Sequence, residues 1–287
     1  MIQRCFTLLM CLVLLVVYAL PVSAQSTTMF SKQAEVDIYG NFYVLNAVRN
    51  TLRLLSRDRG LKREIGGSGW ENDQFDRPAG MWARNGIDVF VADYGNHRIQ
   101  RFDRSLNYIS TLYTRENPNP DERFGYPTDV ALSRLGDLFI CDKENSRIVK
   151  VNRFSQVERT LGGFDAGKGR LSAPTQVEIG PKDHVYVVDG TRVVVYDTFG
   201  NFLRELAAFR SPLLLHADES GVVVADSAML YCFDDEERPV CTLGLQEAAG
   251  VRSEAIRSLA FSRDSMFVLG AEGVTAIVSP RRKGQEQ

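Results

Sequence analysis

The sequence repeats one short pattern at intervals of about forty to fifty residues, and this period constrains the fold more than any other feature. Each copy has an apolar residue, two variable residues and a proline, and the prolines follow one another after 49, 47 and 38 residues. A period in the forties is typical of chains in which each repeat forms one four-stranded blade of a β-propeller. The four copies are Phe75-Asp76-Arg77-Pro78, Phe124-Gly125-Tyr126-Pro127, Leu171-Ser172-Ala173-Pro174 and Phe209-Arg210-Ser211-Pro212.

The segment after each proline has the pattern of consecutive β-strands. A short apolar stretch leads to a polar turn, and a second run of β-branched and aromatic residues follows, such as Val185-Tyr186-Val187-Val188. These runs are apolar on both faces, which suits strands that are covered on both sides by neighbouring blades. Each run ends in aspartate, and arginine opens the next strand in three copies. The aspartates are Asp93, Asp142, Asp189 and Asp226, and the arginines are Arg98, Arg147 and Arg192.

Two of these copies resemble the NHL repeat family. They are Ala92-Asp93-Tyr94-Gly95-Asn96-His97-Arg98-Ile99-Gln100-Arg101-Phe102 and Cys141-Asp142-Lys143-Glu144-Asn145-Ser146-Arg147-Ile148. The resemblance covers about residues 34–280 and implies an all-β, six-bladed propeller of four-stranded antiparallel blades. The last blade has three evident strands. We therefore expect Thr28 to Lys32 to supply the fourth and close the ring, which would leave no open gap between the chain ends.

The N-terminal segment is predicted to be a processing signal. Arg4 precedes an apolar run from Cys5 to Leu20, and Ser23-Ala24 end a small-residue site of the kind that signal peptidase cuts. An uncleaved membrane anchor is the alternative, because the run is only slightly short of a membrane span. We therefore expect a signal peptide at 1–24, a propeller at 25–280 and a polar tail at 281–287. The mature chain would be secreted or periplasmic, without a membrane span.

The charge of the chain argues against one class of partner. Lys plus Arg number 34 and Asp plus Glu number 36, which gives a formal charge of −2. No basic field over the whole chain is therefore present to attract polyanions such as nucleic acid or acidic lipid, and we expect no nucleic-acid partner. The hydrophobic fraction of 44% is that of a folded globular protein and supports a sizeable core.

The repeated aspartates and arginines are interpreted as structural. A ligand site is normally made once, whereas these residues recur in successive blades. We expect each carboxylate to accept N–H groups of a turn and each arginine stem to pack against the next blade.

Two cysteines of the mature chain are placed to meet. Cys232 and Cys241 flank a turn that would set them opposite each other on antiparallel strands. Either a disulfide or two half-buried thiols would fit that position in an oxidising compartment. The cysteine and histidine spacings match no zinc ligand set.

Polar residues also recur on the innermost strands, two and four positions after the prolines. Side chains two apart share one face of a strand, so these residues are expected to point together toward an axial channel. Carboxylate and amide oxygens would suit calcium better than zinc. The alternative is a wet channel whose polar groups satisfy one another, with Arg257 as counter-charge. The channel residues are Asp129, Gln176, Glu178, His216 and, by a weaker register, Glu35.

The remaining candidates are non-repeating residues on the face formed by the loops between blades and by the second-to-third strand turns. Aromatic and charged side chains mix there, as they do in binding surfaces. The members of this set are Trp70, Arg77, Tyr94, Arg123, Tyr126, Lys143 and Arg210.

These observations favour a non-enzymatic binding or scaffold propeller outside the cytoplasm, which recognises a protein, peptide or glycan on that face. The sequence shows no nucleophile paired with a base and no nucleotide-binding glycine pattern, so no catalytic residue is assigned. The alternative is a metal-dependent lyase or hydrolase with a cation in the axial channel, since the resemblance extends to zinc-dependent lyases. That alternative requires Asp129, Glu178 and His216 to converge.

Overall fold

The computed structural model describes residues 33–210, 212, 214–226, 228–245, 256–262, 265–270 and 273–278. The predicted signal peptide at 1–24, the predicted closing strand from Thr28 to Lys32 and the tail at 281–287 lie outside these residues. In the part of the chain that is described, no helix has the length and apolar character needed to cross a membrane.

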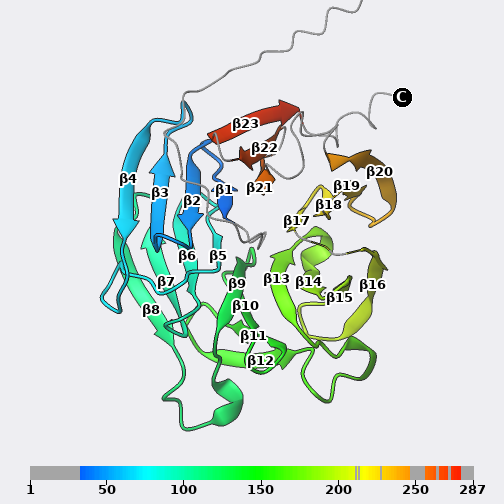
Figure 1. The fold of residues 1–287 in the computed structure, drawn as a ribbon. Coiled ribbons are helices and arrows are strands. Elements are labelled where there is room, and N and C mark those ends of the chain that lie inside the picture. Colours follow the sequence, from blue (N-terminus) through cyan, green and yellow to red (C-terminus); the bar gives the residue numbers. More distant parts are fainter. Residues whose placement is uncertain are drawn as a thin grey trace, which may run out of the picture.

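The described strands form antiparallel sheets arranged around a central axis (Figure 1). Blade 1 has β1 (Ala34–Val36), β2 (Phe42–Asn46), β3 (Thr51–Leu55) and β4 (Leu61–Gly66). Blade 2 has β5 (Gly80–Trp82), β6 (Asp88–Asp93), β7 (Arg98–Asp103) and β8 (Tyr108–Tyr113). Blade 3 has β9 (Pro127–Leu132), β10 (Leu138–Asp142), β11 (Arg147–Val151) and β12 (Val157–Leu161).

Two further four-stranded blades and a smaller sheet follow. Blade 4 has β13 (Pro174–Ile179), β14 (Val185–Asp189), β15 (Arg192–Tyr196) and β16 (Phe202–Ala208). Blade 5 has β17 (Leu214–Asp218), β18 (Gly221–Ala225), β19 (Met229–Phe233) and β20 (Pro239–Gly244). The last sheet has β21 (Ile256–Ser262), β22 (Ser265–Gly270) and β23 (Gly273–Val278).

The prediction of an all-β propeller with four-stranded antiparallel blades is confirmed, but the number of blades differs. Five sheets among the described residues have four strands, instead of the six that we predicted. The last sheet has three described strands, and Thr28 to Lys32, which we expected to add its outer strand, lie outside the described residues.

The apolar runs form the second strand of each blade, and both of their faces are covered. Every residue of β6, β10 and β14 is buried. The largest apolar cluster joins three blades, with Trp82 from blade 2, Phe139 from blade 3 and Val177 from blade 4. The core therefore lies between blades, where burial of apolar surface holds neighbouring sheets together.

The innermost strands form a ring, since each contacts the innermost strand of the next sheet and β21 contacts β1. Each blade is an antiparallel meander, so its β-turns alternate between two ends. We call the end with the first-to-second and third-to-fourth strand turns the lower face. The end with the second-to-third strand turns and the loops between blades is the upper face.

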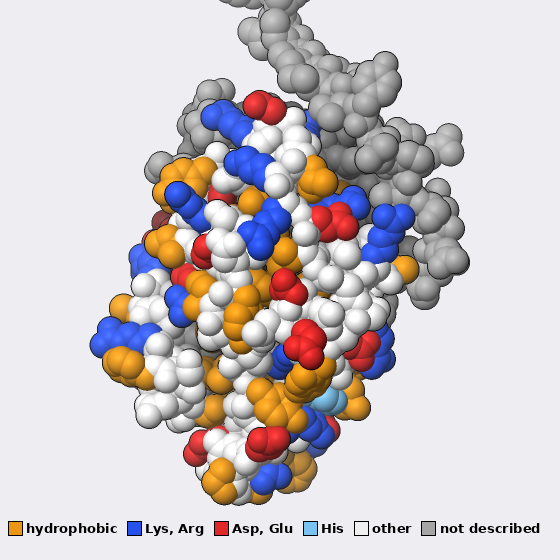
Figure 2. All heavy atoms as spheres, turned by 90° about the vertical axis from the view of Figure 1, so that its left-hand side faces the viewer, with side chains coloured by type: hydrophobic (Ala, Val, Ile, Leu, Met, Phe, Trp, Pro, Cys, Tyr) orange, Lys and Arg blue, Asp and Glu red, His pale blue; other side chains and the backbone are white. Residues whose placement is uncertain are grey.

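The outermost strands carry charges that protect their open edges. Lys62, Arg63 and Glu64 are exposed on β4, and Glu158 and Arg159 are exposed on β12. Figure 2 views the molecule from the side of β4 and β8, where orange hydrophobic side chains alternate with charged ones. Charged side chains on edge strands oppose pairing with other chains.

Candidate binding surface

The upper face of blades 2 and 3 is held in place by the repeated aspartate and arginine. Arg98 is 3% exposed and its Nε donates to Oδ2 of Asp93 at 2.8 Å. The same guanidinium donates to the backbone oxygens of Trp70 at 2.7 Å and Gln74 at 2.9 Å. The other oxygen of Asp93 accepts the N–H of Asp76 at 2.8 Å. This ion pair therefore fastens the loop that carries Trp70 and Arg77 to the blade.

The next blade repeats this arrangement. Arg147 Nε donates to Asp142 at 3.0 Å, and its Nη2 donates to the backbone oxygen of Arg123 at 2.7 Å. Gly125 N donates to Asp142 at 3.1 Å. The carboxylates accept these N–H groups from the loop before the blade, whereas we predicted N–H groups of a turn; the turn N–H of Asn145 reaches Asp142 at 3.4 Å. The arginines in addition bind carbonyl groups of the loop that precedes their own blade, which was not anticipated.

Two tyrosines from neighbouring blades form an aromatic pair on this face. The rings of Tyr94 and Tyr126 have centroids 5.1 Å apart. Arg77 and Lys143 each place their cation 5.5 Å from the centroid of the Tyr94 ring. A cation over an aromatic face is an electrostatically favourable contact. We call these four residues the tyrosine cluster.

The backbone of the tyrosine cluster is unusual at two equivalent positions. Arg77 and Tyr126 each precede the proline of their repeat, and each has a φ of 48°. Residues with side chains rarely adopt this left-handed conformation, and such positions gather at functional sites. The fold therefore accepts backbone strain where the two side chains are presented.

His97 supports the tyrosine cluster from below. Its ring centroid lies 4.1 Å from that of Tyr126, and its Nδ1 accepts the N–H of Tyr126 at 3.1 Å. Arg115 Nη1 lies 3.3 Å from the same nitrogen and forms an ion pair with Glu144 at 2.6 Å. Nδ1 must be unprotonated to accept the Tyr126 N–H. The His97 ring therefore holds the backbone of Tyr126 when the imidazole is neutral.

A second aromatic pair lies beside the first. Trp70 is 53% exposed and its ring meets that of Tyr113 edge-on, with centroids 5.6 Å apart. The Arg98 guanidinium lies 4.8 Å from the Trp70 ring. Glu144 raises the pKa of Arg115 and the nearby Tyr113 adds to this shift, so the pair lies close to the arginine that contacts His97. We call the two groups together the upper surface, made of Trp70, Arg77, Tyr94, Tyr113, Arg115, Tyr126 and Lys143.

The structure brings together five of the seven residues predicted for this face. Arg123 instead donates to the backbone oxygen of Asn117 at 2.6 Å and fastens its own loop. Arg210 is exposed in the loop between blades 4 and 5, away from blades 2 and 3. Sequence reasoning missed Tyr113, which ends β8, and Arg115, which lies in the loop that follows this strand.

Two of the predicted channel residues link neighbouring blades. Asp129 Oδ2 accepts the N–H of Val177 from blade 4 at 3.1 Å. Gln176 Oε1 in turn accepts the N–H of Leu215 from blade 5 at 2.8 Å. Gly80 occupies the same position in blade 2, where a Cβ would meet Asp129. These side chains therefore join one innermost strand to the next.

A side-chain cation lies between two of the predicted channel residues, Glu35 and Glu178, and it belongs to Arg84, which sequence reasoning did not single out. Its Nε donates to Glu35 at 3.0 Å, its Nη1 donates to the Ala217 oxygen at 2.8 Å, and its Nη2 pairs with Glu178. Burial alone would lower the pKa of Arg84, but Glu178 and Glu35 together raise it. The guanidinium therefore stays charged and connects blade 2 to blades 1, 4 and 5.

His216 lies on the innermost strand of blade 5, β17. Its ring stacks on Phe261 with centroids 4.5 Å apart, and Nε2 lies 3.4 Å from Asp218. Among the described residues, no three of His, Cys, Asp and Glu come together as a metal site. Calcium therefore stays a prediction with no ligand set in this part of the chain, and the Arg257 side chain lies outside the described residues.

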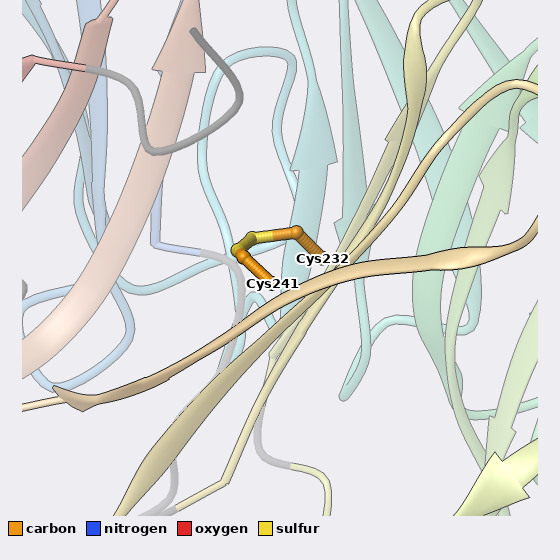
Figure 3. The surroundings of a disulfide bond; sticks show 2 residues. All are labelled: Cys232 and Cys241. Atoms are coloured by element: carbon orange, nitrogen blue, oxygen red, sulfur yellow. A yellow bond between two sulfur atoms is a disulfide. The ribbon is translucent and has the colours of Figure 1, made fainter. Parts of the chain in front are cut away.

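Cys232 and Cys241 face each other in the register of β19 and β20, and their sulfur atoms are joined in a disulfide (Figure 3). Their Cα atoms are 5.0 Å apart. The bond lies within blade 5, so it fastens the outer strand of that blade and takes no part in the upper surface.

Acidification is expected to loosen the upper surface through His97. Burial, with the nearby Arg115, lowers the pKa of His97 from its ordinary value of 6.5. A histidine whose pKa is lower in the folded state stabilises the fold when the pH is above its pKa in the unfolded chain. This stabilisation is lost as the pH falls through the pKa of the folded state. An NMR titration, assigned with the His97→Gln variant, should give a pKa below 6.5. A pKa above 6.5 would show that the Tyr126 contact does not hold the ring neutral.

Comparison with known proteins supports the repeat. The NHL repeat model matches residues 124–151. The protein brain tumor of Drosophila melanogaster is 29% identical over 146 residues, which are 50% of this chain and 13% of that protein. A probable peptidyl-alpha-hydroxyglycine alpha-amidating lyase of Caenorhabditis elegans is 31% identical over 110 residues, which are 37% of this chain and 30% of the lyase. The chain thus spans less than a third of either relative.

Solved structures agree on the fold. Virginiamycin B lyase from Staphylococcus aureus has a TM-score of 0.59 at 14% identity, with 86% of this chain and 79% of the lyase covered. A chain of a nidogen and laminin complex has a TM-score of 0.58 at 16% identity, with 85% and 87% covered. Identities this low bear on architecture and not on activity. The chain is a β-propeller of four-stranded antiparallel blades that carries an NHL repeat at residues 124–151.

Proposed function

We propose that this chain is an exported, non-enzymatic binding propeller whose upper surface recognises a protein, peptide or glycan. The observation that carries this proposal is the pair of neighbouring aromatic groups, Trp70 with Tyr113 and Tyr94 with Tyr126. Trp70 and Tyr113 are exposed, and Tyr94 and Tyr126 are half-buried. Aromatic and arginine side chains are those that contribute most to binding interfaces.

The rigidity of the loops that carry these side chains supports the same conclusion. The loops that carry them are fastened by buried Asp–Arg pairs, so the aromatic groups sit on a rigid base. A rigid base loses little conformational entropy when a ligand binds. The cations at Arg77 and Lys143 would add attraction for an acidic or aromatic group of the ligand.

In the proposed exported form, residues 1–24 are removed and Thr28 to Lys32 complete a sixth blade. The next residue along the chain favours this arrangement, because Gln33 N donates to Ser258 of the last sheet at 3.2 Å. β1 also contacts β21, so the chain already lies against that sheet where the description begins.

The alternative of a metal-dependent lyase or hydrolase in the axial channel receives less support. It requires Asp129, Glu178 and His216 to converge, whereas Asp129 binds the N–H of Val177 and His216 stacks on Phe261. The place expected for a cation between Glu35 and Glu178 is taken by the Arg84 guanidinium.

The test is a binding experiment on the upper surface. The processed chain, immobilised and exposed to an extracytoplasmic fraction, should retain a partner that the triple variant Trp70→Ala, Tyr94→Ala, Tyr126→Ala loses by at least about tenfold in Kd. A matched control removes three aromatic side chains from the lower face, namely Tyr39, Phe154 and Phe199. Equal retention by both triple variants would move the binding site elsewhere.

A further inference from the structure

The lower face exposes large hydrophobic side chains at the turns of four consecutive blades. Turn tips normally carry glycine or small polar residues, because these residues adopt the backbone angles of a sharp turn and their side chains can hydrogen-bond the turn backbone. Here the tips carry side chains that are more than half exposed, and the glycines that make the bend stand next to several of them. They are Ile38 (71%), Tyr39 (56%), Ile87 (64%), Leu135 (75%), Phe154 (69%) and Phe199 (68%).

Three of these side chains are aromatic and are held by the same kind of turn. The side chains of Asp37, Asn152 and Asp197 each accept the backbone N–H of the aromatic residue two positions later, at 2.9 Å in all three turns. The aromatic residues are Tyr39, Phe154 and Phe199, and we call them the aromatic tips. An Asx turn of this kind fixes the local backbone, so each ring is presented outward on a rigid support.

An arginine accompanies each aromatic tip. The guanidinium carbon of Arg104 lies 5.7 Å from the Tyr39 ring centroid. That of Arg153 lies 4.9 Å from Phe154, and that of Arg159 lies 5.9 Å from Phe199. Arginines next to exposed rings combine attraction for anions with the apolar side chains that enter a lipid headgroup layer.

The aliphatic members of the set lie nearer the axis and belong to the same surface. A Cβ at Gly86 would meet the Tyr39 ring and Ile38, so the turns of blades 1 and 2 touch. Arg134, next to Leu135, reaches Asp183 of blade 4 and Glu219 of blade 5. The exposed carboxylates Glu219, Asp235 and Glu236 on this face belong to blade 5, and Asp58 of blade 1 stands between Arg57 and Arg59. Cationic and hydrophobic tips therefore predominate in blades 1 to 4 of the lower face, and acidic groups predominate in blade 5.

We propose that the lower face of blades 1 to 4 docks on an anionic lipid surface, with the aromatic tips in the headgroup layer and the adjacent arginines against lipid phosphates. Separate tips, each with its own cation, suit a layer that is fluid and uniformly charged. A protein partner would instead match a continuous, shaped patch. This proposal concerns the face opposite the upper surface and does not depend on the proposed function.

The experiment uses the processed chain, beginning at Gln25, and vesicles of two compositions. Phosphatidylcholine vesicles with about one-third phosphatidylglycerol should sediment the protein, and added salt should release it. Pure phosphatidylcholine should retain much less. The variant Tyr39→Ser, Phe154→Ser, Phe199→Ser should bind the anionic vesicles at least about tenfold more weakly, with an unchanged thermal melt.

Two phenylalanines offer a matched pair of single variants. Phe154 is 69% exposed with Arg153 4.9 Å from its ring, and Phe164 is 76% exposed with Arg170 4.5 Å from its ring, but Phe164 lies on the upper face. Phe154→Ser should weaken vesicle binding and Phe164→Ser should not. Equal effects of the two changes, failure of the parent chain to bind, or equal binding to both lipids would overturn the proposal. So would a dimer, seen without lipid, that the triple variant abolishes, because a second copy would then cover this face.

Discussion

Replacing Arg84 with methionine is expected to lower the free energy of unfolding by about 3–5 kcal/mol, because two buried carboxylates lose their guanidinium partner. Glu35 is 1% exposed and Glu178 is fully buried. Methionine keeps much of the apolar volume of the arginine stem, so the change isolates the charge and its hydrogen bonds. Urea denaturation at neutral pH, followed by circular dichroism, measures the effect.

The control for this variant is an arginine whose ion pairs are in water. Arg134 also bonds two carboxylates, Asp183 and Glu219, but its side chain is 58% exposed. Arg134→Met should cost less than about 1 kcal/mol, as exposed pairs do. Similar losses in the two variants would mean that Arg84 does not connect the blades in the way described.

Replacing Arg98 with methionine is expected to cost about 3 kcal/mol or more, since Asp93 would stay buried without its ion pair. The variant also frees the backbone oxygens of Trp70 and Gln74, which Arg98 binds. The loop at 67–77 should therefore become a site of limited proteolysis before the protein unfolds. Thermal denaturation and the digestion pattern measure the two effects.

The matched variant is Arg192→Met in blade 4. Arg192 occupies the same repeat position and pairs with Asp189 at 2.8 Å, but its side chain is 27% exposed, compared with 3% for Arg98. Its loss should cost less, about 1–2 kcal/mol, because water can enter at the partly exposed guanidinium and solvate Asp189, whose own side chain is 2% exposed. An equal loss at both positions would show that burial does not set the strength of these pairs.

The sequence predicted the blades well because their strands depend on local pattern. β10 covers the apolar run that begins at Leu138, and β11 and β15 begin at Arg147 and Arg192 as expected. The strand run ends at Asp93, Asp142 and Asp189 in the three blades with the clearest repeat. In blade 5 the strand ends one residue before the aspartate, because β18 ends at Ala225. The next strand, β19, begins at Met229 and not at an arginine.

The contacts between innermost strands of different blades could not be predicted from the residue pattern of one strand. Alternation predicted that Asp129 and Gln176 share a face, but not that each would reach the backbone N–H of the next blade. These bonds between blades depend on how closely the innermost strands approach each other, and the sequence of one strand does not determine that distance. Arg84 stands six residues after Pro78, so the same alternation carried one step further would have placed it with Glu178 and His216 on one face.

The upper surface was predicted only in part, because the contacts that form it also join different blades. Trp70, Tyr94 and Tyr126 drew notice as aromatic residues in loops, and the structure shows which rings meet. Tyr113 ends an outer strand and carries no loop signal, although it contacts Trp70. Contacts between loops of different blades depend on the ring closure, so they cannot be read from one repeat.

The links between innermost strands bear on how this protein comes apart. Asp129 holds blade 4, Gln176 holds blade 5, and Ser258 of the last sheet accepts the N–H of Gln33 at the start of blade 1. A sheet tied on both sides cannot detach without disturbing its neighbours. The amides of β9, β13 and β17 should accordingly exchange with solvent deuterium at similar, slow rates, through one shared opening of the whole ring.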